Sequence, residues 1–89
     1  MKMDKDLFAN VGRGAAAQAA FAIIDVLQKA PKQNRIAGIS IAFVLLAEHL
    51  DIRPDEAQRI VANIMADPNN GFGRARQFQA IADYMKNEL

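Results

Sequence analysis

The stretch Arg35–Leu50, RIAGISIAFVLLAEHL, decides the fold of this chain. From Ile36 onward, only Ser40, Glu48 and His49 in this stretch carry polar side chains. A surface helix shows a single apolar stripe, whereas a helix that is apolar on nearly all sides is buried. The β-branched residues also suit a buried strand, but strands usually run about 4–8 residues and this run is longer. The sequence therefore predicts a central helix over 35–50 with neighbours on most of its sides.

Three more segments show helical periodicity between residues that break helices. The segment AAAQAAFAIIDVLQKA is rich in strong helix formers, and Pro31 ends it because proline lacks a backbone N–H donor. Pro54 suits the first position of a further helix, and DPNNG at 67–71 predicts a turn before the last helix. We therefore predict an all-α fold: a compact bundle of four main helices, at about 14–30, 35–50, 54–66 and 73–88, around the buried central helix.

The length of the chain and its apolar content together indicate an oligomer. Its 89 residues predict a single domain, 1–89, with a charged lead-in at 1–12. A domain of this size buries only about 60% of the surface of its unfolded chain, yet 52% of the residues are apolar. Several of them fall on more than one face of a predicted helix. We expect the surplus apolar surface to be buried in a homodimer.

Charge and cysteine content exclude several classes of function. The net charge of +1 gives no support to a general nucleic-acid or membrane-surface role. The absence of Cys excludes disulfides and thiolate chemistry, and it fits a cytoplasmic protein. The uncharged run between Arg35 and Glu48 is shorter than the roughly 20 residues that span a bilayer, so no membrane association is expected. Size and helical style suggest a phage- or plasmid-type accessory factor.

Residues able to carry out chemistry are few and scattered. His49 is the one histidine, and Ser40 is the one candidate nucleophile near it. The Gly-rich turns at 12–14 and 71–74 precede helices, but neither follows a strand or matches a nucleotide-binding fingerprint. We therefore expect no catalytic activity, metal, cofactor or small-molecule substrate.

One local pattern indicates a DNA-binding motif. Ala47 is a small residue near the end of the central helix, Asp51 and Ile52 form the turn, and Ala57 and Ile60 are aliphatic positions of the next helix. With these residues, 43–61 resembles the helix-turn-helix superfamily of bacterial and phage repressors, in which the turn normally carries Gly followed by an apolar residue. The resemblance implies that one face of the second helix enters the major groove of DNA.

The resemblance and local charge together define a candidate DNA-binding surface. The connector 29–35 holds three positive charges and no acid, the strongest charge bias in the chain. It is expected either to be a solvated loop or to contact phosphates beside the second helix. The candidate DNA-binding residues are Lys29, Lys32, Arg35, Arg53, Gln58, Arg59 and Asn63.

A second candidate surface lies on the last helix, and charge favours it over DNA. Residues 51–89 hold five bases and six acids, a net charge of −1, whereas non-specific DNA affinity comes from neutralising phosphates with Lys and Arg. We therefore expect a small non-catalytic interaction or regulatory protein that binds another protein, with a helix-turn-helix DNA-binding transcriptional regulator as the alternative. The candidate partner-binding residues, which also fit a solvated helix face, are Arg74, Arg76, Gln77, Gln79 and Tyr84.

Overall fold

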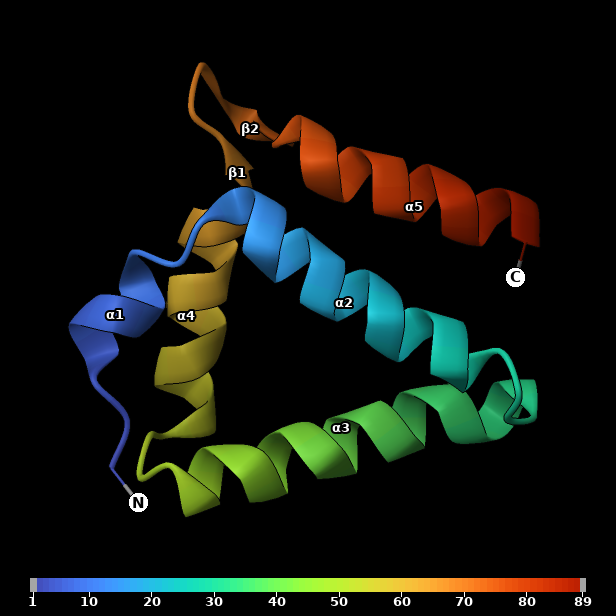
Figure 1. Ribbon diagram of the computed structural model, residues 1–89, viewed down its shortest axis with the longest axis horizontal. Helices are drawn as coiled ribbons and strands as arrows, with labels where there is room; N and C mark the ends of the chain where they lie inside the picture. The colour runs from blue at the N-terminus through green and yellow to red at the C-terminus, as the bar shows by residue number, and fades with distance from the viewer. Residues whose placement is uncertain (1, 89) are drawn as a thin grey trace.

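The chain is mostly helical, and its helices begin and end close to its prolines and turn residues. The computed structural model describes the backbone of residues 2–88 and the side chains of residues 2–69 and 73–87. Its elements are α1 (Lys5–Ala9), α2 (Arg13–Leu27), α3 (Lys32–His49), α4 (Pro54–Met65), β1 (Ala66–Asp67), β2 (Asn70–Arg74) and α5 (Arg76–Glu88) (Figure 1). The prediction of an all-α chain is confirmed, with a small two-stranded sheet added to the helices. Part of the charged lead-in forms α1, where the Asp4 side chain accepts backbone hydrogen bonds at the helix N-terminus.

The turn between α2 and α3 is closed by Arg35. Its guanidinium donates hydrogen bonds to the carbonyls of Ala30, over 2.9 Å, and Gln28, over 3.1 Å. Carbonyls at the end of a helix have no partner within the helix, so these bonds satisfy groups that α2 leaves open. Pro31 caps α3, and α3 begins three residues before the position predicted for the central helix.

A β-hairpin joins α4 to α5. The turn predicted at 67–71 lies within this hairpin, whose strands pair antiparallel with Ala66 opposite Arg74. The last helix was predicted to begin at about residue 73, which is wrong because residues 70–74 pair with β1 instead. Ala75 directly follows β2 and donates its backbone N–H to the carbonyl of Met65, the last residue of α4, over 2.8 Å.

Three helices form the sides of an open triangle in projection. Figure 1 shows α2, α3 and α4 as these sides, with α5 running along the outside of α2 and α1 beside α4. The packed pairs are α2 with α5, α3 with α4, and α1 with α4. The core therefore lies around α4, at one end of α3.

Two small clusters make up this core. One consists of Ala47, Ile52 and Ala57, at the junction of α3 and α4. The other consists of Ile64, Ala75 and Phe78, which join α4, the hairpin and α5. The half-buried side chains that pack against both clusters are Phe8 and Ile60.

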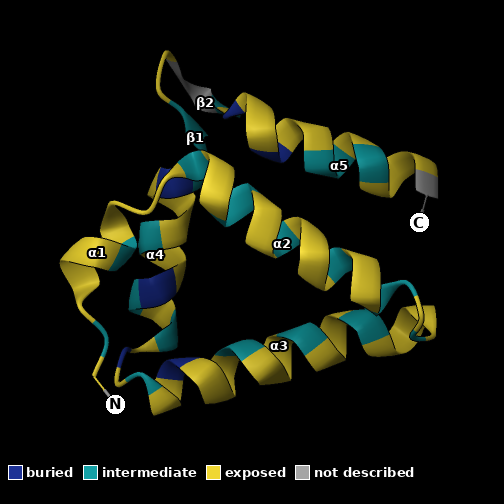
Figure 2. Ribbon diagram, viewed as in Figure 1, coloured by how far each residue is buried: buried dark blue, intermediate teal, exposed yellow. Residues whose placement is uncertain are grey.

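The prediction of a central helix buried on nearly all sides is wrong for the single chain. Within α3 only Ala47 is buried, and Figure 2 shows most of the helix as exposed. Ile36 is 71% exposed and Ile41 is 60% exposed. Since α3 touches the core only near its C-terminal end, most of its apolar residues are exposed in the single chain. A four-helix bundle around α3 is therefore not formed by one chain alone.

The chain is folded but carries more surface than its mass requires. Its radius of gyration is 13.7 Å, close to the roughly 12 Å of a folded chain of this length and far from the roughly 30 Å of an unfolded one. Its solvent-accessible surface is 6714 Å², whereas a folded monomer of 9.8 kDa is expected to expose roughly 5,200 Å². The excess, about 1,500 Å² on this scaling, is a property of the arrangement of the helices.

Candidate functional site

The turn between α3 and α4 has a defined geometry. Asp51 has a φ of 60°, in the left-handed region that glycine enters most easily. The N–H of Ile52 donates to the carbonyl of Ala47 over 3.0 Å, and the N–H of Asp51 donates to the carbonyl of Glu48 over 3.1 Å. This pair of bonds is the Schellman arrangement that ends a helix. Asp51 therefore occupies the left-handed position where the repressor motif carries glycine.

The residues that carried the helix-turn-helix resemblance come together at this turn. Ala47, Ile52 and Ala57 form one buried cluster, with Ile60 packed against it. Figure 1 shows α4 rising steeply from the end of α3. The small side chains of Ala47 and Ala57 allow the two helices to approach closely where they meet.

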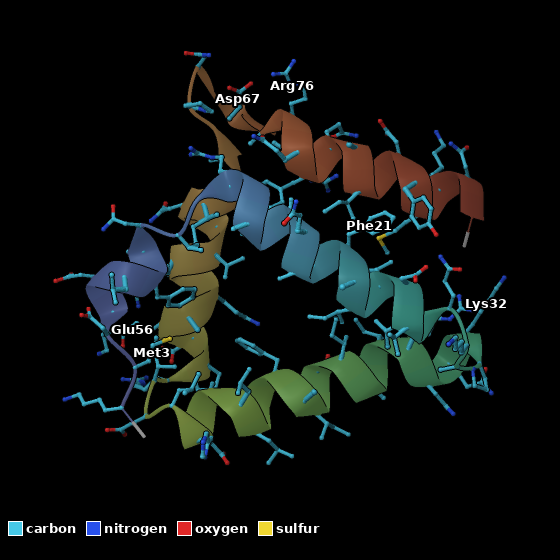
Figure 3. The ribbon with its side chains drawn as sticks, in the orientation of Figure 1. Met3, Phe21, Lys32, Glu56, Asp67 and Arg76 are labelled. Carbon is cyan, nitrogen blue, oxygen red and sulfur yellow. The ribbon has the colours of Figure 1, made fainter. Side chains whose placement is uncertain are left out.

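The candidate DNA-binding residues fall into two separate groups. Arg53, Gln58, Arg59 and Asn63 are exposed on or beside α4, whereas Lys32 is exposed at the opposite end of α3. Figure 3 shows Lys32 at the far side of the molecule from Glu56 of α4. The 18 residues of α3 separate the two groups, a length of roughly 27 Å.

Two of the candidate arginines make polar contacts within the chain. Arg53 pairs with Asp55 over 3.1 Å. Arg35 is half-buried and bound to the end of α2. Lys29 is exposed in the same turn. The structure therefore does not gather the predicted DNA-binding residues into one basic surface.

Most of the candidate partner-binding residues lie on the solvent side of α5. Arg74, Arg76, Gln77 and Gln79 are exposed, and Gln79 donates a hydrogen bond to Asp83 over 3.0 Å. We call these four residues the polar surface of α5: Arg74 is the last residue of β2, and the other three lie in the first turn of α5.

Tyr84 has a role within the chain. Its ring lies 4.7 Å from the ring of Phe21, centroid to centroid, with the planes tilted by 52°. Its hydroxyl accepts a hydrogen bond from Gln28 Nε2. Tyr84 is half-buried and joins α5 to α2. It therefore supports the packing of these two helices and is less exposed than the other candidate partner-binding residues.

The largest unexplained feature is apolar, and it lies on α3. Arg35, Ile39, Phe43 and Ala47 recur every four residues and form the partly covered side of the helix. The opposite side, which we call the outer face, is exposed and carries no charge between its ends. It consists of Ala37, Gly38, Ile41, Val44 and Leu45.

This outer face is costly for an isolated chain. Leu45 is 59% exposed, and full burial of a large aliphatic side chain contributes about 1.5–3 kcal/mol. Gly38 lies in the middle of the helix, where glycine costs about 0.5–1 kcal/mol relative to alanine. A Cβ atom placed on Gly38 would meet nothing within 4 Å. Packing within the chain therefore explains neither the exposed leucine nor the glycine.

The apolar surface continues from α3 onto α2. Ile23 and Val26 of α2 are exposed, the latter by 65%. A groove of about 430 Å³ lies between the two helices beside Gly38. Its lining residues are Ala22, Ile23, Val26, Leu27, Gly38, Ile39 and Ala42. The sequence indicated a surplus of apolar surface that a homodimer would bury, but it did not indicate that this surface lies between α2 and α3.

A second apolar hollow separates α2 from α4 and α5. It has a volume of about 440 Å³, and Arg74 is the one charged residue among the described residues that line it. Its other lining residues are Phe8, Val11, Ala16, Ala20, Ile24, Val61, Ile64, Met65, Phe78, Ile81, Ala82 and Met85. Because many of these also pack against the core, the hollow is an extension of the core toward solvent.

The residues considered for chemistry do not form a site together. Ser40 and His49 lie nine residues apart on α3, a separation of roughly 14 Å along the helix axis. That distance excludes a hydrogen bond between them. Among the side chains that the structure describes, no group of three or more His, Asp or Glu lies close enough to hold a metal ion. Within the described part of the chain, no helix is both long and apolar enough to cross a membrane.

Comparisons with known protein families, with curated proteins and with solved structures find no match to this chain.

Proposed function

We propose that this chain is a small non-catalytic interaction protein with a regulatory role, and that it acts by binding another protein through the apolar surface of α2 and α3. The observation that supports this proposal is the exposure of large aliphatic side chains along α3, with Ile41 and Leu45 each more than half exposed. Soluble monomers rarely expose continuous apolar patches of more than a few hundred square ångströms. A patch of this kind is typical of a surface that a partner covers.

Photo-cross-linking in cells that express the chain tests this proposal. A photoreactive amino acid replaces Val26, on the apolar surface, and in a matched variant Gln77, on the polar surface of α5. Both positions are exposed, so both variants are expected to fold. We expect protein adducts at Val26. Adducts at Gln77 alone would assign binding to the polar surface, and a lack of protein adducts at both positions would exclude protein binding.

A DNA-binding transcriptional regulator is the second candidate, and the geometry at Asp51 favours it. A left-handed residue at this turn, followed by buried Ile52, is the arrangement that the repressor motif achieves with glycine. The polar side of α4 then carries Gln58 and Arg59 toward solvent. The split of the basic residues between the two ends of α3 is the reason this candidate ranks second.

A gel shift on random duplex DNA at low salt tests the second candidate. Phosphate contacts are strongest at roughly 50 mM salt, so a DNA-binding protein is expected to shift the duplex there. Arg59→Ala is expected to weaken a shift that depends on α4, and Lys32→Ala one that depends on the connector. Absence of any shift at this salt concentration rules out the DNA-binding function.

A further inference from the structure

We propose that a second copy of this chain covers the outer face of α3, with the two α3 helices antiparallel and Ile41 at the two-fold axis. This inference rests on the proposed function and names the partner at the same surface. It also accounts for the conflict between a sequence typical of a buried helix and a single chain that leaves the helix open.

The surface area of the chain matches what a dimer needs. The chain exposes 6714 Å², about 1,500 Å² more than the surface expected for its mass. Stable interfaces of standard size bury roughly 800 Å² on each partner, and obligate homodimers bury more and are more apolar. A second copy placed on α3 and the adjoining α2 would therefore remove an excess of the size that an obligate homodimer buries.

The side chains of the outer face are complementary to themselves when the helices run antiparallel. Leu45 follows Ile41 by four residues, and Gly38 precedes it by three, on the same side of the helix. Val44 and Ala37 hold the equivalent positions on the other side. A two-fold axis at Ile41 therefore sets Leu45 against the partner's Gly38 and Val44 against the partner's Ala37. Each large side chain meets a small one, as interdigitated helices require.

The glycine and the groove beside it fit this arrangement. No atom of the chain lies within 4 Å of a Cβ placed on Gly38, so the space is open in the single chain. The groove of about 430 Å³ between α2 and α3 opens at this glycine. In the antiparallel pair the partner's Leu45 enters this space. The helix therefore carries glycine where a second helix makes its close approach.

Charge at the ends of α3 selects the antiparallel direction. Lys32 lies at the N-terminal end, and Glu48 and Asp51 lie at the C-terminal end, all three exposed. Glu48 follows Ile41 by seven residues and shares its side of the helix, whereas Lys32 lies on the opposite side. Antiparallel helices centred on Ile41 place Glu48 beside the partner's Asn34, which is uncharged, whereas parallel helices would place the two Glu48 carboxylates beside each other, which is unfavourable.

A matched pair of charge substitutions tests the surface. Ile41→Glu and Leu7→Glu both replace an aliphatic residue that is at least 60% exposed in the single chain, so both variants are expected to keep their helical content by circular dichroism. We expect analytical ultracentrifugation to find the unaltered chain and Leu7→Glu dimeric at micromolar concentration. We expect Ile41→Glu to be monomeric, its dissociation constant raised at least about tenfold, because two unpaired carboxylates would meet at the axis.

Single cysteines test the direction of the helices, since the chain has no cysteine of its own. A short bismaleimide is expected to join Ile41→Cys into a covalent dimer and to leave Gln79→Cys, on α5, monomeric. Spin labels on Asn34→Cys, which lies on the same side of α3 as Ile41, are expected to lie on the order of 20 Å apart or more in the antiparallel pair, against about 10 Å in a parallel one.

The outcomes separate this inference from the proposed function. A monomeric unaltered chain, or a dimer that Ile41→Glu leaves intact, would overturn the α3 pairing. In either case photo-cross-linking at Val26 still decides whether the chain binds a different protein. Close labels at Asn34 would reject the antiparallel direction. A dimer that Ile41→Glu dissociates and Leu7→Glu does not, with distant labels at Asn34, supports the inference.

Discussion

Arg13 Nε donates a 2.9 Å hydrogen bond to the backbone carbonyl of Ile64. Arg13 is the first residue of α2, and Ile64 lies in the last turn of α4, so the bond joins the two helices where they meet. Its Nη2 also reaches the carbonyl of Ala66, over 3.5 Å. Carbonyls at the end of α4 lack hydrogen-bond donors within the helix, and the Arg13 guanidinium supplies these donors.

Removal of this guanidinium is expected to destabilise the chain. Arg13→Met keeps much of the aliphatic length but leaves the Ile64 carbonyl without its donor, so the free energy of unfolding is expected to fall by about 1.5–3 kcal/mol. Urea denaturation measures the change. Arg59→Met is the control, because Arg59 is exposed on α4 and its loss is expected to cost less than about 0.5 kcal/mol. Equal effects of the two substitutions would contradict the role assigned to Arg13.

The backbone at Asp51 predicts an unusual stabilising substitution. Asp51 has a φ of 60°, a conformation that costs a residue with a side chain roughly 1 kcal/mol relative to glycine. Asp51→Gly is therefore expected to raise the midpoint of thermal unfolding, and Asp51→Val to lower it. A lower midpoint for Asp51→Gly would show that the aspartate side chain, and not the backbone conformation, holds the turn.

Two glycines distinguish stability of the helix from stability of the dimer. A Cβ atom at Gly38 or at Gly14 meets nothing within 4 Å in the single chain, so alanine at either position is expected to stabilise its helix by up to about 1 kcal/mol. In the proposed dimer Gly38→Ala also fills space taken by the partner's Leu45, so it is expected to weaken association, whereas Gly14→Ala is not. Dilution experiments by sedimentation measure the dissociation constants. Equal constants for the two variants would contradict a close approach at Gly38.

The contacts of Tyr84 predict a graded response. Tyr84→Phe keeps the ring against Phe21 and loses the hydrogen bond from Gln28, so it is expected to cost about 0.5–1.5 kcal/mol of unfolding free energy. Tyr84→Ala removes both contacts and is expected to cost more. Chemical denaturation of the two variants checks the order. Equal costs would mean that the ring contact contributes nothing.

Local signals predicted the helices well and the hairpin poorly. Pro31 and Pro54 act on their immediate neighbours, and the structure places helix starts at or just after both. The pairing of Ala66 with Arg74 depends instead on two segments that meet across a turn. The prediction that the last helix begins at about residue 73 was therefore corrected only by the tertiary structure.

The candidate site residues also divide into those whose exposure the local sequence pattern predicts and those whose contacts only the tertiary structure shows. The exposure of Arg76, Gln77 and Gln79 follows from the polar side of an amphipathic helix, which the spacing of apolar residues predicts. The contacts of Tyr84 with Phe21 and Gln28 join α5 to α2, and no local pattern indicates which residues from distant helices will meet.

The sequence by itself determined that the chain is helical, where its main helices lie, and that residues 36–47 carry one polar side chain, that of Ser40. Only the tertiary structure decided that the single chain leaves most of these residues exposed, with α3 meeting the core at Ala47. The physical reason is that apolar side chains along a helix are more stable when they are removed from water. The pattern does not specify whether the surface that buries them belongs to the same chain or, as we propose, to a second one.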